Sequence, residues 1–163
     1  MKKRRNGIVL LIFLFLLAGV IFAFSAQNAE KSGNISEYFT KNFLQIFHIT
    51  DVSIGKAERF LRKAAHFAEF FLLGALLCLW IWRFRKGVWF TGTVSFAIAF
   101  AYAVLDEGHQ YFIPGRSASL KDVLLDGAGA LCGVLLVLAI EAAVCFVRRK
   151  RSEKVNKSYE NKQ

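Results

Sequence analysis

The chain has 163 residues, of which 55% are hydrophobic, with a mean hydropathy of +0.40, 17 phenylalanines and one proline. A soluble domain of this length has too little interior to bury so many apolar residues. No alternation of polar and apolar residues over about ten positions recurs, which argues against an outer-membrane barrel. The net charge of +10 lies beside the apolar runs, so we interpret it as a topology signal and expect no nucleic-acid partner.

Four apolar runs predict an all-α integral membrane protein with four transmembrane helices. They cover residues 7–24, 64–82, 88–105 and 123–140, each close to the roughly 20 residues that cross a hydrocarbon core about 30 Å thick. The first run could instead be a signal peptide, with Ala23-Phe24-Ser25 as its cleavage site. Because this run is longer than a usual signal core, we expect a retained helix. The three cysteines lie inside apolar runs without a CxxC pair, so neither a disulfide nor a zinc site is expected.

Lysine and arginine residues are concentrated on one side of such a four-span bundle. They occur at 2–5, in the loop 83–86, and from 148 to 151. Because positive charge beside a span favours the cytoplasmic side, we predict a multi-pass protein of the cell membrane with both termini in the cytoplasm. Residues 1–150 then form a single membrane domain and 151–163 a charged cytoplasmic tail. The polar sequence after Val147 favours disorder.

The loop between the first two runs contains a segment with helical periodicity. Its apolar residues fall on one face and its polar residues on the opposing one, namely Ile35, Tyr38, Phe39, Phe43, Ile46 and Phe47 against Glu37, Lys41 and Gln45. This pattern predicts a short amphipathic helix on the outer face of the protein. It could lie on the outer leaflet or pack over the end of the bundle, and the sequence favours neither.

Polar residues gather where the second run enters the membrane from the outside. Arg59, Arg62, His66 and Glu69 recur at spacings of three and four, with Lys63 beside them. They therefore form one stripe on a helix. A carboxylate inside a membrane helix costs about 2.5 to 3.5 kcal/mol unless it is paired or protonated. Glu69 is thus expected to have a function or a partner.

The third and fourth runs carry matching polar segments at the same side. Residues 106–110 directly follow the third run, and a turn comes next at 114–116, where proline and glycine favour tight reversal. Ser119 and Asp122 fit a capping box that opens the fourth helix. Asp126, Gly129 and Gly133 then lie on the face of Asp122, a stripe suited to close helix contact. Since consecutive spans joined by short loops pack antiparallel, the three polar segments should meet at one depth.

Taken one at a time, several of these residues also have simpler explanations. Asp122 alone is more typical of a helix cap than of a catalyst, and Arg116 could only neutralise an acid or hold its own turn. Lys63 could anchor the helix in lipid headgroups. His66 alone would suit a satisfied core position. Glu69 and Asp126 are harder to explain in this way, because buried acids in membrane helices are costly.

Three segments together resemble the VanZ-like family. Residues 62–70 resemble its RKxxHFxEF segment, and residues 106–116 its DExxQxFxPGR segment. Asp122, Asp126 and Gly129 resemble DxxxNxxG, although the family often has asparagine where this chain has Asp126. Residues 24–27 are similar to a short FSxQ element. The resemblance spans roughly 7–145 and implies a small bacterial membrane protein of the cell envelope, with a link to tolerance of the antibiotic teicoplanin.

The mixture of acids, histidines and cations suggests a site that acts on a lipid or a lipid-linked envelope intermediate. Candidate catalytic residues, which could exchange protons with a substrate, are Glu69, Glu107, His66 and Asp106. Candidate binding residues are Arg62, Lys63, His109, Gln110, Arg116, Asp122 and Asp126. Glu107 or Glu69 is the preferred acid or base, and Arg116 the preferred anion clamp. No cofactor is evident.

Alternatives stay open at this level. His66, Glu69, Asp106, Glu107 and His109 could bind a divalent metal, although no compact ligand spacing is present. The cluster could bind a headgroup, a cell-wall precursor or a partner without chemistry, or it could only set the register of the helices. The sequence also leaves a homo-oligomer open.

Overall fold

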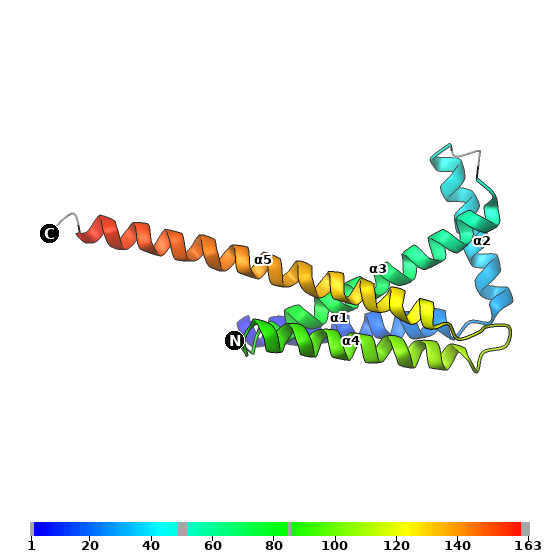
Figure 1. The fold of residues 1–163 in the computed structure, drawn as a ribbon, viewed down its shortest axis with the longest axis horizontal. Helices are drawn as coiled ribbons and strands as arrows, with labels where there is room; N and C mark the ends of the chain where they lie inside the picture. Colours follow the sequence, from blue (N-terminus) through cyan, green and yellow to red (C-terminus); the bar gives the residue numbers. More distant parts are fainter. Residues whose placement is uncertain (1, 49–51, 85, 161–163) are drawn as a thin grey trace.

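The computed structural model describes residues 2–48, 52–84 and 86–160, and every regular element in these ranges is an α-helix. The helices are α1 (Lys2–Ser25), α2 (Ala29–Ile46), α3 (Ile54–Trp82), α4 (Val88–Gln110) and α5 (Leu120–Glu160) (Figure 1). All but α2 are long and apolar enough to cross a membrane, which confirms the predicted four-span fold. Arg85, in the predicted basic loop, and residues 161–163 of the predicted tail lie outside the described residues.

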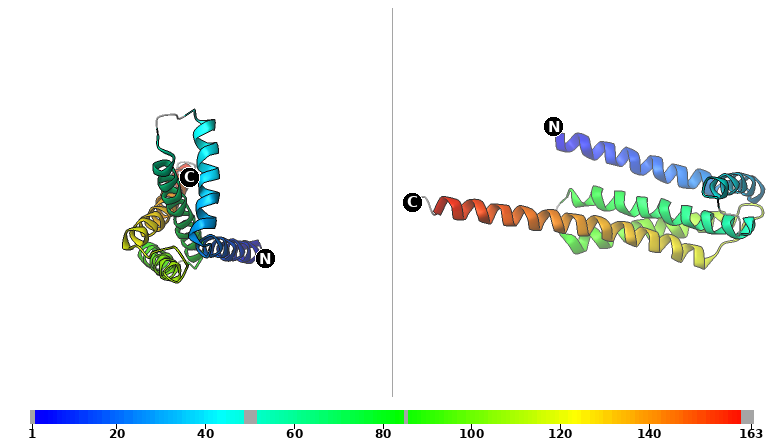
Figure 2. Two further views of the ribbon diagram at one scale, coloured as in Figure 1. Left: turned by 90° about the vertical axis from the view of Figure 1, so that its right-hand side faces the viewer. Right: turned by 90° about the horizontal axis from the view of Figure 1, so that it is seen from above.

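Both chain termini lie at the same end of the bundle, which we call the termini end (Figures 1 and 2). The opposite end, called the polar end, contains the end of α1, the start of α3, the end of α4 and the start of α5. This arrangement follows from four crossings, because an even number returns the chain to its starting side. The long α5 extends beyond the other helices at the termini end (Figure 1).

The centre of the fold is a close contact between α3 and α5. A Cβ atom at Gly129 would collide with the backbone carbonyl of Phe67, and one at Gly133 with that of Phe71. Gly74 of α3 is equally tight against the backbone of Ala130. The absence of side chains at these positions lets the two backbones approach, as in other small-residue contacts of membrane helices. The predicted glycine stripe is therefore confirmed as a packing surface.

The remaining helices cover this contact on different sides. Phe70 of α3 is fully buried, and Ala99 and Ala103 of α4 pack into the same core. The first span, α1, contacts mainly α3 and leaves large side chains such as Phe15 exposed, as expected for a lipid-facing helix. The hydroxyl of Tyr102 in α4 donates a hydrogen bond of 2.8 Å to the carbonyl oxygen of Ala18 in α1. This bond fixes α1 beside α4.

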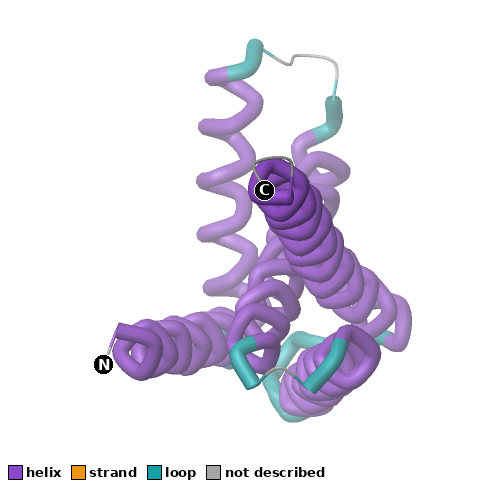
Figure 3. The backbone as a smooth tube through the Cα atoms, turned by 90° about the vertical axis from the view of Figure 1, so that its left-hand side faces the viewer, coloured by secondary structure: helices purple, strands orange, loops and turns teal. Residues whose placement is uncertain are grey.

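The amphipathic segment forms α2, which runs across the bundle direction at the polar end (Figures 2 and 3). It packs against α3, and Thr40 is only 1% exposed. Tyr38, Ile46 and Phe47 remain exposed. The helix is therefore confirmed and begins earlier than the predicted segment. One of its faces packs on the bundle, while exposed aromatic residues on it are available to lipid.

The predicted disorder after Val147 is wrong, because α5 continues as a helix to Glu160. Lysine, arginine and glutamate are good helix formers, so a polar tail does not by itself interrupt a helix. Arg149 and Glu153 form an ion pair of 3.0 Å with four-residue spacing, which supports the helix locally. The Lys150 ammonium lies 4.7 Å from the ring centre of Phe146.

Candidate functional site at the polar end

Two contacts between α3 and α5 order the polar residues of both helices. The Lys63 ammonium lies 2.9 Å from the Asp122 carboxylate, and both side chains are partly exposed. One turn deeper, His66 Nδ1 lies 3.9 Å from Asp126 Oδ2. The Asp126 side chain is only 2% exposed, whereas that of His66 is 26% exposed. The glycine contact that brings α3 and α5 together thus also aligns their polar stripes in register.

The carboxylates at the end of α4 have different partners. Asp106 accepts a hydrogen bond of 3.1 Å from the side-chain amide of Gln110. Its other oxygen, like one oxygen of Asp126, is buried with no hydrogen-bond partner among the described residues. Glu107 accepts the backbone N–H of Ser119 at 2.6 Å, which ties the end of α4 to the start of α5.

The Glu107 contact corrects one expectation from the sequence. In a Ser119–Asp122 capping box, the Asp122 carboxylate would accept the N–H of Ser119. Instead Glu107 takes that donor, and Asp122 turns to Lys63 of α3. An acid from another helix can replace the local one, since any correctly placed carboxylate satisfies the free N–H groups of a first turn. Glu107 therefore has a structural partner that its sequence context did not indicate.

The turn between α4 and α5 places Arg116 over this cluster. Gly115 has a φ of 78°, a left-handed conformation that favours glycine, as the proline–glycine pair predicts. The Arg116 guanidinium donates to the carbonyl oxygen of Phe24 at 3.3 Å, so it also links the turn to the end of α1. Partial burial and the charge of nearby Arg62 lower the pKa of Arg116, while Asp106 and Glu107 act to raise it. It nevertheless stays charged at neutral pH.

Two clefts adjoin at the polar end and share three residues, Arg62, His66 and Arg116. The polar cleft has a volume of about 260 Å³. Its other walls include Arg59, Lys63, Glu107, Gln110, Ser117 and Asp122. The second cleft, of about 270 Å³, lies between α2, α3 and the end of α1. We call it the α2–α3 cleft; Phe24, Ile35, Phe39 and Leu61 give it an apolar wall, and Glu69 also lines it.

The structure thus brings most of the predicted residues together around the two clefts, where they line the polar cleft, the α2–α3 cleft, or both. Lys63, Glu107, Gln110 and Asp122 line the polar cleft, Glu69 lines the α2–α3 cleft, and Arg62, His66 and Arg116 line both. Asp106 and Asp126 are buried beneath them. Asp126 lies 3.9 Å from the ring nitrogen of His66. His109 lines neither cleft: its ring stacks on Phe22 of α1 with centres 4.8 Å apart.

The metal alternative gains no support from this arrangement. Within the described residues, no three or more histidine, cysteine, aspartate or glutamate side chains are placed to hold a metal ion. Three of the five proposed ligands face different helices: Glu107 faces α5, His109 faces α1 and Glu69 lines the cleft beside α2. These three side chains therefore do not point toward a common position where they could coordinate one metal ion.

Sequence reasoning missed the part of the site that α2 contributes. Ser36 and Thr40 line the α2–α3 cleft together with Gln27. The Thr40 hydroxyl donates to the carbonyl oxygen of Ser36 at 2.8 Å. These two small polar residues lie one turn apart beside the apolar stripe of α2, and this spacing is the sequence signal that would predict that this side of the helix packs against the bundle. The FSxQ element is visible in the sequence, but the contact of Phe24 with Arg116 depends on tertiary structure.

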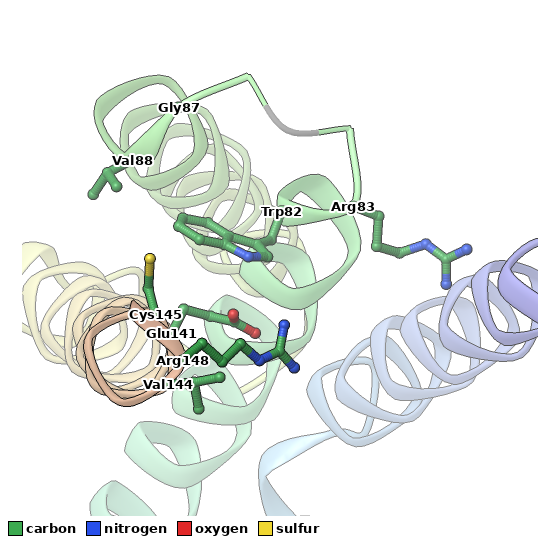
Figure 4. Close-up of a pocket in the computed structure, with 8 residues that line it drawn as sticks. All are labelled: Trp82, Arg83, Gly87, Val88, Glu141, Val144, Cys145 and Arg148. Carbon is green, nitrogen blue, oxygen red and sulfur yellow. The ribbon is translucent and has the colours of Figure 1, made fainter. Parts of the chain in front are cut away.

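A larger cavity, of about 510 Å³, lies at the termini end. It is lined by Trp82, Arg83, Gly87, Val88, Glu141, Val144, Cys145 and Arg148. Figure 4 shows Glu141 and Arg148 extending from the same side of α5. None of the predicted site residues lies in it, and the motif segments all converge at the other end. The polar end is therefore the candidate site.

The comparisons with known proteins agree with the motif segments. A family model described as VanZ/LLP1 matches residues 10–141. No curated protein and no solved structure matches the chain. The matched range includes most of the first span, the other spans up to Glu141, α2, and every residue of the polar-end site. The chain therefore belongs to the VanZ/LLP1 family.

Proposed function

We propose that this protein recognises an anionic group of a lipid or lipid-linked envelope component at the outer surface of the cell membrane. The observation that carries the proposal is the shared wall of the two clefts, where Arg62 and Arg116 flank His66. Arg62 is paired with Glu58 of its own helix at 2.7 Å and Arg116 with the carbonyl oxygen of Phe24, but each guanidinium has further N–H groups that can donate to the oxygens of a bound anion. Planar guanidinium groups also match phosphate and carboxylate oxygens in pairs.

The proposed side of the membrane rests on the distribution of positive charge. Both termini lie at the end opposite the site. The arginine and lysine clusters at 2–5 and 148–151, together with Arg83 and Lys86, belong to that end as well (Figure 1). Positive charge beside spans favours the cytoplasm, so the polar end faces outward. Teicoplanin acts outside the cell, and the family resemblance links such proteins to tolerance of it, which is consistent with an outward site.

An acid–base step is the second candidate, and a specific observation favours Glu69 for it. The side chain of Glu69 lines the α2–α3 cleft, and no hydrogen bond or ion pair to it is found within the described part of the chain. It is therefore available to exchange a proton with a bound molecule. Glu107, which was equally preferred from the sequence, already accepts the Ser119 N–H at 2.6 Å. Its carboxylate is better suited to holding α4 against α5.

Antibiotic susceptibility of a sensitive Gram-positive host tests the proposal. The host would carry empty vector, wild type, Arg116→Ala, or Arg149→Ala as a matched control, with equal membrane levels shown by blot. Arg149 is an exposed arginine on α5, paired with Glu153 far from the site. We expect wild type and Arg149→Ala to raise teicoplanin tolerance and Arg116→Ala to lose the effect.

One further variant separates recognition from chemistry. Glu69→Gln keeps the shape of the side chain but removes its ability to exchange a proton. If the site only binds, Glu69→Gln keeps tolerance close to wild type. If Glu69 takes part in a reaction, tolerance falls to the level of Arg116→Ala. Equal tolerance in Arg116→Ala and wild type would refute anion recognition at this site.

A further inference from the structure

We infer that the ligand of this site is an amphiphile whose apolar chain enters the α2–α3 cleft while its phosphate or other anionic head lies on Arg62 and Arg116. The inference rests on the proposed function and adds to it the class of ligand and the direction in which it lies. Its basis is a difference in polarity: on one side of the shared residues the cleft is bordered by charged groups, and on the other side it has an apolar wall.

The sizes of the clefts indicate one divided site. Ligand sites usually measure roughly 300–1,000 Å³. The polar cleft and the α2–α3 cleft, of about 260 and 270 Å³, each fall just short of this range, but together they lie within it. Since Arg62, His66 and Arg116 belong to both, a molecule at this boundary can extend into either side.

The walls of the clefts set the direction of such a molecule. The polar cleft is bordered by charged groups, including Lys63, Glu107 and Asp122, and would exclude a hydrocarbon chain. The α2–α3 cleft has Phe39 of α2 opposite Leu61 and Ala65 of α3, and it adjoins the exposed aromatic residues of α2. An apolar chain would therefore enter on the α2 side, from the lipid, with its head toward the α4–α5 turn.

Glu69 then lies where the head joins the chain. It is three residues beyond His66 on the same helix, about 4.5 Å further along the axis, and it lines only the α2–α3 cleft. A wholly apolar chain pocket would not need a carboxyl group at this depth. A polar linkage with a donor, such as an amide N–H or a hydroxyl between head and chain, would donate a hydrogen bond to the carboxylate. The inferred ligand therefore has an anionic head, a polar linkage and an apolar chain.

Photocrosslinking with two lipid probes tests this assignment. Both probes carry the same photoreactive apolar chain, and one has a phosphate head and the other a neutral hydroxyl head. The full-length protein would be placed in micelles of a neutral, phosphate-free detergent, and crosslinked residues mapped by mass spectrometry. We expect the phosphate probe to label the α2–α3 cleft at positions such as Phe39 and Leu61. The hydroxyl probe should label these positions much less.

Two adjacent alanines supply a matched pair of variants. Ala64 and Ala65 are both exposed on α3, but only Ala65 lines the cleft. Ala65→Trp would fill the cleft and reduce labelling there by roughly tenfold, the usual consequence of overfilling a packed site. Ala64→Trp should leave labelling unchanged. The wild-type label map stands by itself if Ala65→Trp fails to fold.

The outcomes separate this inference from the proposed function. The inference is overturned if labelling depends on the phosphate and on Arg116 but lies outside the α2–α3 cleft. It is also overturned if Ala65→Trp does not change this labelling. In both cases anion recognition, the proposed function, still stands. Labelling that is the same for both heads and for Arg116→Ala overturns both. Added inorganic phosphate distinguishes the sources of the anion: if it abolishes labelling at low concentration, the site prefers free phosphate and the chain assignment is wrong. We expect it to compete only weakly.

Discussion

Adding one methyl group at Gly133 should separate α3 from α5 and, with them, the two halves of the candidate site. A Cβ at this position would collide with the carbonyl oxygen of Phe71 and lie 3.0 Å from the backbone nitrogen of Ala75. Overfilling a packed contact usually costs about 1–3 kcal/mol. Because both obstacles are backbone atoms of a helix and cannot rotate away, we expect Gly133→Ala to lose about 3 kcal/mol of unfolding free energy.

The appropriate control is Gly19→Ala in α1. Gly19 is exposed, and a Cβ there would meet nothing within 4 Å. Alanine is favoured over glycine in a helix by roughly 0.5–1 kcal/mol, so this variant should be neutral or slightly more stable. Unfolding in mixed detergent micelles, followed by helical circular dichroism, measures both. Equal stability of the two variants would refute the close α3–α5 contact.

The same structure makes three smaller predictions. Asp126→Asn should keep or raise the unfolding free energy by about 1 kcal/mol, because one buried Asp126 oxygen has no partner among the described residues; a large loss of stability in detergent would contradict this. Glu107→Leu should lose about 1.5–3 kcal/mol by leaving the Ser119 N–H without its acceptor, and Glu107→Gln, which keeps an acceptor oxygen, should lose less; equal losses would show that the N–H contact is unimportant. Lys63→Ala should change stability by less than about 1 kcal/mol, since its pair with Asp122 is partly exposed; a larger loss on the same unfolding curve would indicate a second role for Lys63.

The spans and the convergence of the polar stripes could be predicted from the sequence because both follow from helical periodicity and span length. The stripe that contains His66 and Glu69, and the stripe from Asp122 to Gly133, are each predicted from residue spacings of three and four alone. The helix ends were less predictable. α3 begins at Ile54, well before the apolar run, and α5 continues beyond it to Glu160. Hydropathy marks where a helix enters lipid and not where its hydrogen bonding begins.

The individual partners within the site could not be predicted in the same way. Glu107 and Asp122 are both acids near Ser119, and sequence proximity favoured Asp122. In the structure the Ser119 N–H donates to Glu107, because the α4–α5 turn folds back over the end of α4. His109 similarly belongs to a motif but faces Phe22. Such choices depend on which helix lies on which side, and periodicity alone does not determine that arrangement.

The most direct test of anion recognition at the polar end is the set of lipids that remain with the purified protein. Wild type, Arg116→Ala and Arg149→Ala would be purified from the same cells in a mild detergent, and their bound lipids compared by mass spectrometry. The account predicts that wild type and Arg149→Ala retain the same enriched species with an anionic head, and that Arg116→Ala loses it. Identical lipid profiles in all three proteins would contradict the account.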